Sequence, residues 1–148
     1  VITNLEQVEL LQILHKLYKE VYIPPAVARE IATWHPKLLL ETPWLRVISP
    51  RNIDLISNLE LSLDRGESEA ISLSLELEAD LLLLDEKAGR RKAKELEINI
   101  TGISGLLLIA KESSLIPLVM PVIEKLKVNT SFYVHDSLYQ AIKDQSKE

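Results

Sequence analysis

Four consecutive leucines followed by two acids occur in the stretch Asp80-Leu81-Leu82-Leu83-Leu84-Asp85-Glu86-Lys87-Ala88-Gly89-Arg90-Arg91. An apolar run without alternation predicts a strand buried on both faces, and such strands occur mainly in parallel sheets covered by helices. In open α/β sheets, ligands bind beyond the carboxyl ends of the strands. We therefore expect Asp85 and Glu86 to deliver two carboxylates to a crevice at the surface.

The composition fits one globular domain, residues 1–148, with a net charge of −5 and a mean hydropathy of +0.08. The absence of cysteine excludes disulfides, thiolate nucleophiles and cysteine zinc sites. The negative net charge argues against a protein that coats nucleic acid by bulk charge. No apolar run approaches the roughly 18 residues of a membrane helix, so we expect no membrane partner and a cytoplasmic location.

Predicted helices and strands alternate along the chain, which indicates an α/β sandwich with a parallel sheet. The predicted helices are 4–19, 25–34, 52–63, 66–78, 86–96, 103–112, 115–126 and 137–143. The predicted strands are 21–23, 44–48, 81–84, 98–100 and 132–134, with a loop at 35–43 and a frayed tail at 145–148. Because the chain begins at Val1 with no strand before a helical pattern, we expect native residues to precede it.

Residues 71–78 alternate between apolar and polar side chains, a period that taken alone would predict a strand. The composition favours a helix, because Leu, Glu and Ala are strong helix formers and only Ile71 is β-branched. The strand expected at Leu81 also leaves almost no turn for a second strand before it. We therefore predict a helix whose small serines let it pack on two sides.

Two acids follow a glycine at the start of this helix, in Gly66-Glu67-Ser68-Glu69-Ala70-Ile71. An electrostatic explanation suffices for the pair in isolation, since carboxylates there favour the positive end of the helix dipole by about 0.3–1 kcal/mol. If the helix and the following strand run antiparallel, however, Glu67 returns close to Asp85. Two carboxylates in one crevice raise each other's pKa unless a cation intervenes, and Mg²⁺ prefers such oxygen ligands.

These segments, together with Ile100-Thr101-Gly102 and Tyr22-Ile23-Pro24-Pro25-Ala26-Val27-Ala28-Arg29-Glu30, resemble the PIN domain, and most closely its VapC-like subgroup of largely uncharacterised prokaryotic members. The resemblance covers nearly the whole chain and is most specific in residues 64–105. It implies a three-layer sandwich with a central parallel sheet flanked by helices. It also implies a Mg²⁺- or Mn²⁺-dependent ribonuclease, often the toxin of a toxin–antitoxin pair.

The resemblance implies an acidic cluster that binds the metal and supports catalysis. Its members in this sequence are Glu30, Glu67 and Asp85, with Glu69 and Glu86 as weaker candidates. A further member is an aspartate at the end of a first strand, which would lie before Val1. Thr3 and Asn4 fall where the family has polar groups near the metal. The implied partners are RNA, an antitoxin and a second copy of the chain.

A basic window follows the acids, and it includes Lys87, Arg90 and Arg91. The resemblance implies that these three side chains hold the substrate backbone, and phosphate contacts of this kind carry little sequence information. The alternative is a solvated helix face with no ligand. Taken alone, the composition of the window favours the solvated face, and only the resemblance favours a substrate contact.

Other classes of protein lack their motifs here. An ATPase needs a phosphate loop of the form GxxxxGK[ST], yet none of the four glycines precedes a lysine. A response-regulator receiver needs an acidic pair after its first strand, which this chain does not display, and no G-x-S-x-G elbow is present. The alternative that stays open is a PIN-fold protein that does not cut RNA and acts as a catalytically silent nucleic-acid-binding or protein-interaction module. The three matching acids favour the enzyme.

Overall fold

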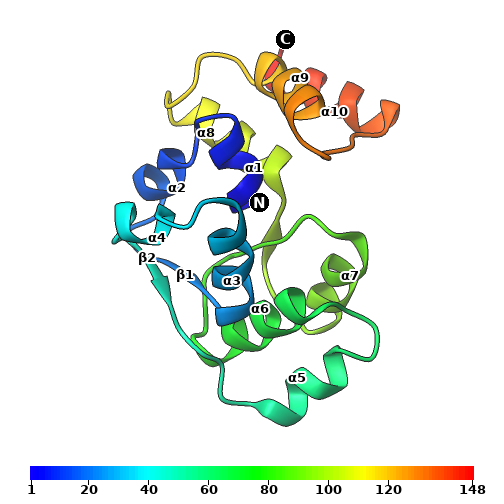
Figure 1. The fold of residues 1–148 in the computed structure, drawn as a ribbon. Helices are drawn as coiled ribbons and strands as arrows, with labels where there is room; N and C mark the ends of the chain where they lie inside the picture. The colour runs from blue at the N-terminus through cyan, green and yellow to red at the C-terminus, as the bar shows by residue number, and fades with distance from the viewer. The chain divides into compact units, whose positions relative to one another are not determined.

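The computed structural model describes residues 1–148 as ten helices and four short strands (Figure 1). The helices are α1 (Ile2–Gln7), α2 (Gln12–Leu17), α3 (Pro25–Trp34), α4 (Leu38–Glu41), α5 (Ile53–Leu59), α6 (Arg65–Glu76), α7 (Lys87–Glu95), α8 (Ile103–Glu112), α9 (Met120–Asn129) and α10 (Asp136–Ser146). The strands are β1 (Val21–Ile23), β2 (Leu45–Val47), β3 (Leu82–Leu83) and β4 (Ile100–Thr101). Contacts divide the chain into a central unit, Tyr18–Thr101, and a terminal unit, Val1–Leu17 with Gly102–Glu148.

All four strands belong to the central unit, and both pairings are parallel. Strand β1 pairs with β2, with Val21 opposite Leu45, and β3 pairs with β4, with Leu82 opposite Ile100. The predicted α/β fold class with parallel strands is therefore confirmed. The strands form two separate two-stranded sheets, each two or three residues long, where a broader central sheet was expected.

Helix α6 is the element around which the central unit packs, since it contacts α3, α5, α7 and β3. The prediction of a helix at 66–78 is confirmed within two residues at each end, against the alternating pattern of the sequence. Its serines explain how one helix serves several neighbours, because Ser68, Ser72 and Ser74 are buried and add little bulk. The helix begins at a capping box: Oδ1 of Asp64 accepts from the backbone N–H of Glu67 at 2.8 Å, and Oε2 of Glu67 accepts from the backbone N–H of Asp64 at 3.2 Å.

The leucine strand is less buried than the sequence predicts. Leu82 and Leu83 are half-buried, and only Leu84, just beyond the strand, is buried. Full burial on both faces needs neighbouring strands and helices on either side, and β3 has a strand on one side only. The apolar core beside it joins α5, α6 and α7 through the buried residues Leu59, Leu63, Ile71, Leu84 and Ala93.

The terminal unit is all helical, and α10 packs against α8 and α9, while α1 packs against α9. The single helix predicted at 4–19 is wrong, because the chain forms α1 and α2 with a break between them. Glu9 lies at the break in a left-handed conformation with φ of 60°, and the N–H of Leu10 turns back to the carbonyl of Leu5 at 2.9 Å. This geometry closes α1 as a helix C-terminus does.

Other elements also differ from the sequence prediction. The helix predicted at 52–63 ends at Leu59, the one predicted at 137–143 spans Asp136–Ser146, and the strand predicted at 98–100 is Ile100–Thr101. Helix α4 occupies part of the predicted loop 35–43, and residues 132–134 form no strand. Helix α9 begins at Met120, five residues later than predicted, and Pro121 lies in its first turn, where proline is tolerated because the N–H there has no partner inside the helix.

The predicted frayed tail is also wrong, because the carboxylate of Glu148 is bound. It accepts from Lys111 Nζ at 2.9 Å and from the backbone N–H groups of Val119 and Met120 at 2.9 and 3.0 Å. Burial raises the pKa of Glu148, but these hydrogen bonds outweigh burial and lower that pKa to about 2. None of the ten helices is both long enough and apolar enough to cross a membrane.

Candidate functional site

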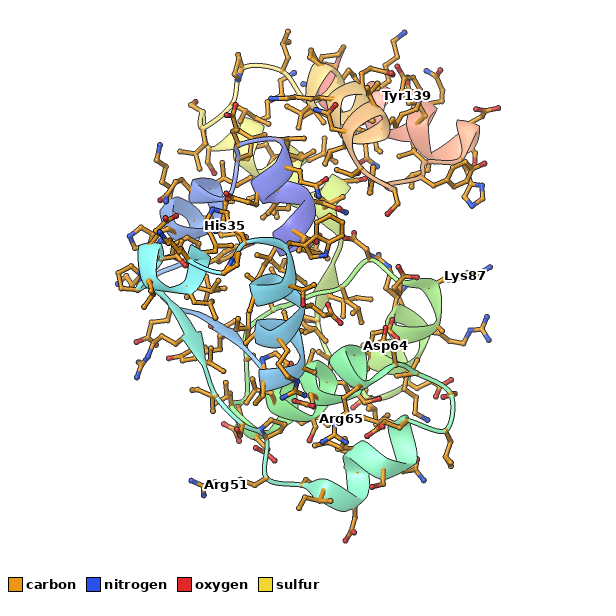
Figure 2. All side chains as sticks on the ribbon, viewed as in Figure 1. His35, Arg51, Asp64, Arg65, Lys87 and Tyr139 are labelled. Carbon is orange, nitrogen blue, oxygen red and sulfur yellow. The ribbon has the colours of Figure 1, made fainter.

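Glu30 and Asp64 converge on Gly66 in the central unit. Glu30 lies on α3, and Asp64 caps α6, which packs against α3. A methyl group added at Gly66 would lie 3.2 Å from Oε1 of Glu30 and 3.5 Å from Oδ1 of Asp64. The missing side chain therefore leaves a small space that two carboxylates border. Figure 2 shows Asp64 and Arg65 at the start of α6.

Glu67 follows Gly66 on α6, and its carboxylate points to α7. A methyl group added at Gly89 would lie only 2.9 Å from Oε1 of Glu67 and 3.0 Å from a methyl of Leu84. Glycine at this position of α7 therefore makes room for the Glu67 carboxylate. Oε2 of Glu67 is held by the capping box, whereas Oε1 is buried and has no hydrogen-bond partner. A buried acceptor without a partner costs about 1–3 kcal/mol, so it needs an explanation.

The electrostatic environment links four carboxylates in this region. Burial raises the pKa of Glu67; the backbone N–H of Asp64 lowers it, and the charges of Asp64, Glu86 and Glu30 raise it. Burial and the charge of Asp64 likewise raise the pKa of Glu30. Like charges held near one another disfavour ionisation, so a cation bound nearby would stabilise the ionised form of these carboxylates.

Asp85 and Glu86 follow β3, as the sequence predicts. Asp85 is half-buried, with its Oδ2 atom buried, and Glu86 is exposed at the start of α7. The charge of Glu86 raises the pKa of Glu67, so Glu86 lies near Glu67, and its role at the metal stays a prediction. The metal-binding role of Asp85 stays a prediction from the family resemblance.

Glu69 has a different environment from Glu67. It is 3% exposed, and its Oε1 atom accepts from the backbone N–H of Ala26 in the first turn of α3 at 3.2 Å. Its Oε2 atom accepts from Arg65 Nε at 2.6 Å. This carboxylate therefore joins α6 to the positive end of α3, and a structural role accounts for its burial.

The predicted basic residues of α7 divide into two kinds. Arg90 is half-buried, and its Nη1 atom donates to the carbonyl of Leu84 at 3.0 Å, so its guanidinium ties α7 to the end of the leucine strand. Lys87 and Arg91 are exposed. Figure 2 shows the Lys87 side chain extending from α7 into solvent. Thr3 and Asn4 lie on α1 of the terminal unit and are half-buried.

An open pocket of about 430 Å³ adjoins Glu30 and Asp64. Its lining comes from α3 and from the start of α6 and consists of Ala26, Arg29, Glu30, Thr33, Asp64, Arg65 and Gly66. The pocket thus brings two acids of the cluster together with two arginines. The sequence alone predicts no role for Arg29, Asp64 or Arg65.

The donor set of this region fits a hard divalent cation. Mg²⁺ is usually bound by one or two carboxylates and keeps several waters, so a cage of protein ligands is not required. No group of three or more Asp, Glu, His or Cys residues in the structure lies close enough together to form such a cage. The buried, unpartnered Oε1 of Glu67 and the space that Glu30 and Asp64 border at Gly66 are consistent with an oxygen-ligated ion.

Asp64 is the acid that sequence reasoning missed. Its carboxylate raises the pKa of both Glu30 and Glu67, so it lies near both of them. A signal was present, because Asp64 stands three residues before Glu67, the spacing of a capping box. That spacing predicts a helix start, and only the fold brings Glu30 to the same place.

A family model described as a PIN domain matches residues 1–148, which is the full chain. PIN domains are generally nucleases and typically use divalent metal ions. No curated protein matches the chain, and neither does any solved structure.

Proposed function

The chain belongs to the PIN domain family, and we propose that it is a Mg²⁺- or Mn²⁺-dependent ribonuclease. The family supports a nuclease at the coarse level. The finer assignment rests on the chemistry of the central unit, where carboxylates gather beside a pocket that also contains arginines. Oxygen donors suit hard cations, and cationic side chains suit the phosphates of RNA.

The observation that carries the proposal is the hydrogen bonding of the Glu67 carboxylate. Its Oε1 atom is buried without a hydrogen-bond partner, while the capping box holds Oε2. Burial and three neighbouring carboxylates raise its pKa, and a cation bound nearby would favour the ionised form. A structural carboxylate would have both oxygens satisfied, as Glu69 has.

In this proposal Glu67 and Glu30 are the carboxylate ligands of the cation, and waters complete its shell. Asp85 is the third acid that the resemblance implies, and Asp64 adds charge from the start of α6. A bound divalent cation supplies Lewis acidity toward a phosphodiester and promotes deprotonation of water. The Asp64 N–H orients the Glu67 carboxylate through Oε2, and Gly89 leaves room for Oε1. Lys87 and Arg91, exposed on α7, are available to a substrate backbone.

The finer expectations from the resemblance form part of the same proposal. These are membership of the VapC-like subgroup, a toxin role with an antitoxin partner, a homodimer and a cytoplasmic location. One observation favours the alternative of a catalytically silent binding module, since no three acids form a metal cage in the structure. Cleavage separates the two candidates.

The test is cleavage of a mixed single-stranded RNA by the full-length protein with Mg²⁺, with Mn²⁺ and with EDTA. Asp85→Asn is compared with Asp80→Asn, which changes an exposed acid on the other side of the same leucine run. We expect cleavage in either metal, loss in EDTA and in Asp85→Asn, and retention in Asp80→Asn. Absence of cleavage by the folded full-length protein would favour the silent module, and equal cleavage by both variants would remove Asp85 from the site.

A further inference from the structure

Arg29 lies beside the acidic cluster, and its side chain makes few contacts that stabilise the fold. It precedes Glu30 on α3, lines the same pocket, and its side chain is 68% exposed. Its one ion pair joins Nη2 to Oε2 of Glu69 at 3.9 Å, which is too long for a hydrogen bond. Such a pair at an exposed arginine contributes little to stability.

Glu69 does not need this second arginine. Its Oε2 atom already accepts from Arg65 Nε at 2.6 Å, and its Oε1 atom accepts from the backbone N–H of Ala26. Arg65 in turn is shared between Glu69 and Glu60, whose Oε1 atom accepts from Arg65 Nη1. Of the two arginines that line the pocket, Arg65 is held by two carboxylates, and Arg29 is the one that can turn to a ligand.

The chemistry of Arg29 suits a phosphate. A guanidinium offers a planar fork of donors that matches two phosphate oxygens, and it keeps its charge at any physiological pH. Arg90 of the predicted basic window is less suited, because its Nη1 donates to the carbonyl of Leu84. The acids Glu30 and Asp64 in the same pocket would repel a phosphate that had no cationic partner there.

We propose that Arg29 binds a backbone phosphate of RNA in the pocket between α3 and the start of α6. This inference rests on the proposed function, because it takes the ligand to be the RNA that the acidic cluster acts on. It makes the pocket the place where the substrate backbone lies next to Glu30 and Asp64. Arg29 is then a substrate-binding residue that the basic window of α7 does not replace.

The experiment measures binding of a fluorescent single-stranded RNA by anisotropy over a series of salt concentrations. The full-length protein carries Glu67→Gln to prevent cleavage, and Mg²⁺ is present throughout. Arg29→Ala is compared with Arg29→Lys and with Arg51→Ala, which changes an exposed arginine in a separate pocket of the central unit (Figure 2). Urea unfolding of each variant detects any purely structural effect.

We expect Arg29→Ala to weaken RNA binding roughly tenfold and to lower the salt slope by about 0.7, the value for one phosphate contact on a single strand. Arg29→Lys should keep the slope and lose part of the affinity, and Arg51→Ala should change neither. The inference is overturned if Arg29→Ala binds RNA with unchanged affinity and slope, or if the unmutated Arg29 protein binds no RNA.

Cleavage, measured separately in protein with Glu67 intact, keeps the two proposals distinct. If Arg29→Ala weakens binding but Glu67-intact protein never cleaves, the phosphate contact stands and the nuclease fails. If Glu67-intact protein cleaves and Arg29→Ala binds normally, the nuclease stands and the phosphate contact fails.

Discussion

Glu67 and Glu69 lie two residues apart on α6, yet the two sides of the helix where they lie differ in kind. On the side that faces α3, Glu69 is 3% exposed and accepts from Ala26 and Arg65, so each of its oxygens has a donor. On the side that faces α7, Glu67 has one oxygen in a capping box and one buried oxygen with no donor. Two glutamates on one helix therefore differ in hydrogen bonding: both oxygens of Glu69 have donors, whereas Oε1 of Glu67 has none.

This difference indicates which glutamate has a structural role and which has a functional role. In a buried carboxylate that is fully hydrogen-bonded, the hydrogen bonds offset the cost of desolvation, and loss of the charge leaves its buried partners uncompensated. A buried carboxylate oxygen without a donor destabilises the fold, and such strain is retained where a ligand relieves it. On this view Glu69 holds α6 against α3, and Glu67 is the group that the cation binds.

The largest effect on stability is expected from Glu69→Gln. The amide group of glutamine would direct its own donors at Arg65 or at the Ala26 N–H, and the charge that both donors face would be gone. We expect a loss of about 2 kcal/mol in the free energy of unfolding, typical of hydrogen bonds to a charged group. Both tryptophans, Trp34 and Trp44, lie in the central unit, so urea unfolding followed by tryptophan fluorescence measures this loss. An unchanged midpoint would remove the distinction between the two glutamates.

Glu148 extends the comparison to the terminal unit, because its carboxylate is hydrogen-bonded to Lys111 and to two backbone N–H groups. We expect Glu148→Ala to cost about 1.5 kcal/mol at neutral pH. Its folded pKa of about 2 lies below the ordinary 4.5, so this stability is present above pH 4.5 and is lost as pH falls toward 2. Urea unfolding by far-UV circular dichroism should therefore show the two proteins converging in acid. A constant difference at all pH values would contradict the ion pair.

Gly89→Ala tests the Glu67 side of α6 without changing a charge. The added methyl would lie 2.9 Å from Oε1 of Glu67, so the carboxylate must move. We expect cleavage to fall about tenfold, because small misplacements of a catalytic group are costly. Stability should change by less than about 1 kcal/mol, because the helix preference of alanine and the displacement of Glu67 and Leu84 oppose each other. A variant that loses stability and keeps its activity would indicate packing at Gly89 and no functional constraint.

The smallest effect is expected from Glu67→Gln on stability, measured in EDTA. The pKa of Glu67 is raised above the ordinary 4.5, so the native state binds the proton more tightly than the unfolded state does. The contribution of Glu67 is therefore favourable below pH 4.5 and declines as pH rises through its folded pKa. The variant lacks this decline and should gain less than about 1 kcal/mol over the wild type between about pH 4 and pH 7, because water screens a half-buried charge. A growing loss with pH would contradict the raised pKa.

The sequence predicted the bounds of helices whose starts carry a local signal. The bounds of α3 and α8 agree with the prediction, because proline and glycine mark their starts. The alternation of residues 71–78 alone would predict a strand, whereas helix propensity predicts α6, and the structure confirms the helix. The serines at the alternating positions are buried, which explains why the pattern does not follow the usual helical period. The break at Glu9 was missed, because a glutamate in the left-handed conformation gives no signal of a helix end.

The candidate site was predictable only in part. Glu30 and Glu67 came from the family resemblance, and the structure places both beside Asp64. The sequence placed Glu67 above Glu69 as a candidate, but it could not show the structural role of Glu69, because the donor that fixes Glu69 is the N–H of Ala26, 43 residues away along the chain. Likewise, no local pattern reveals that Arg90 is tied to Leu84, while the neighbouring Arg91 is exposed.

The most direct test of this account compares RNA cleavage by Glu67→Gln and Glu69→Gln in Mg²⁺, at a temperature where circular dichroism finds both folded. We predict that Glu67→Gln lowers the single-turnover rate by about 100-fold or more, as loss of a group that stabilises the transition state does. Glu69→Gln should cleave within a few-fold of the wild type despite its lower stability. Wild-type cleavage by Glu67→Gln, or equal losses in both variants, would contradict the assignment of function to one side of α6 and support to the other.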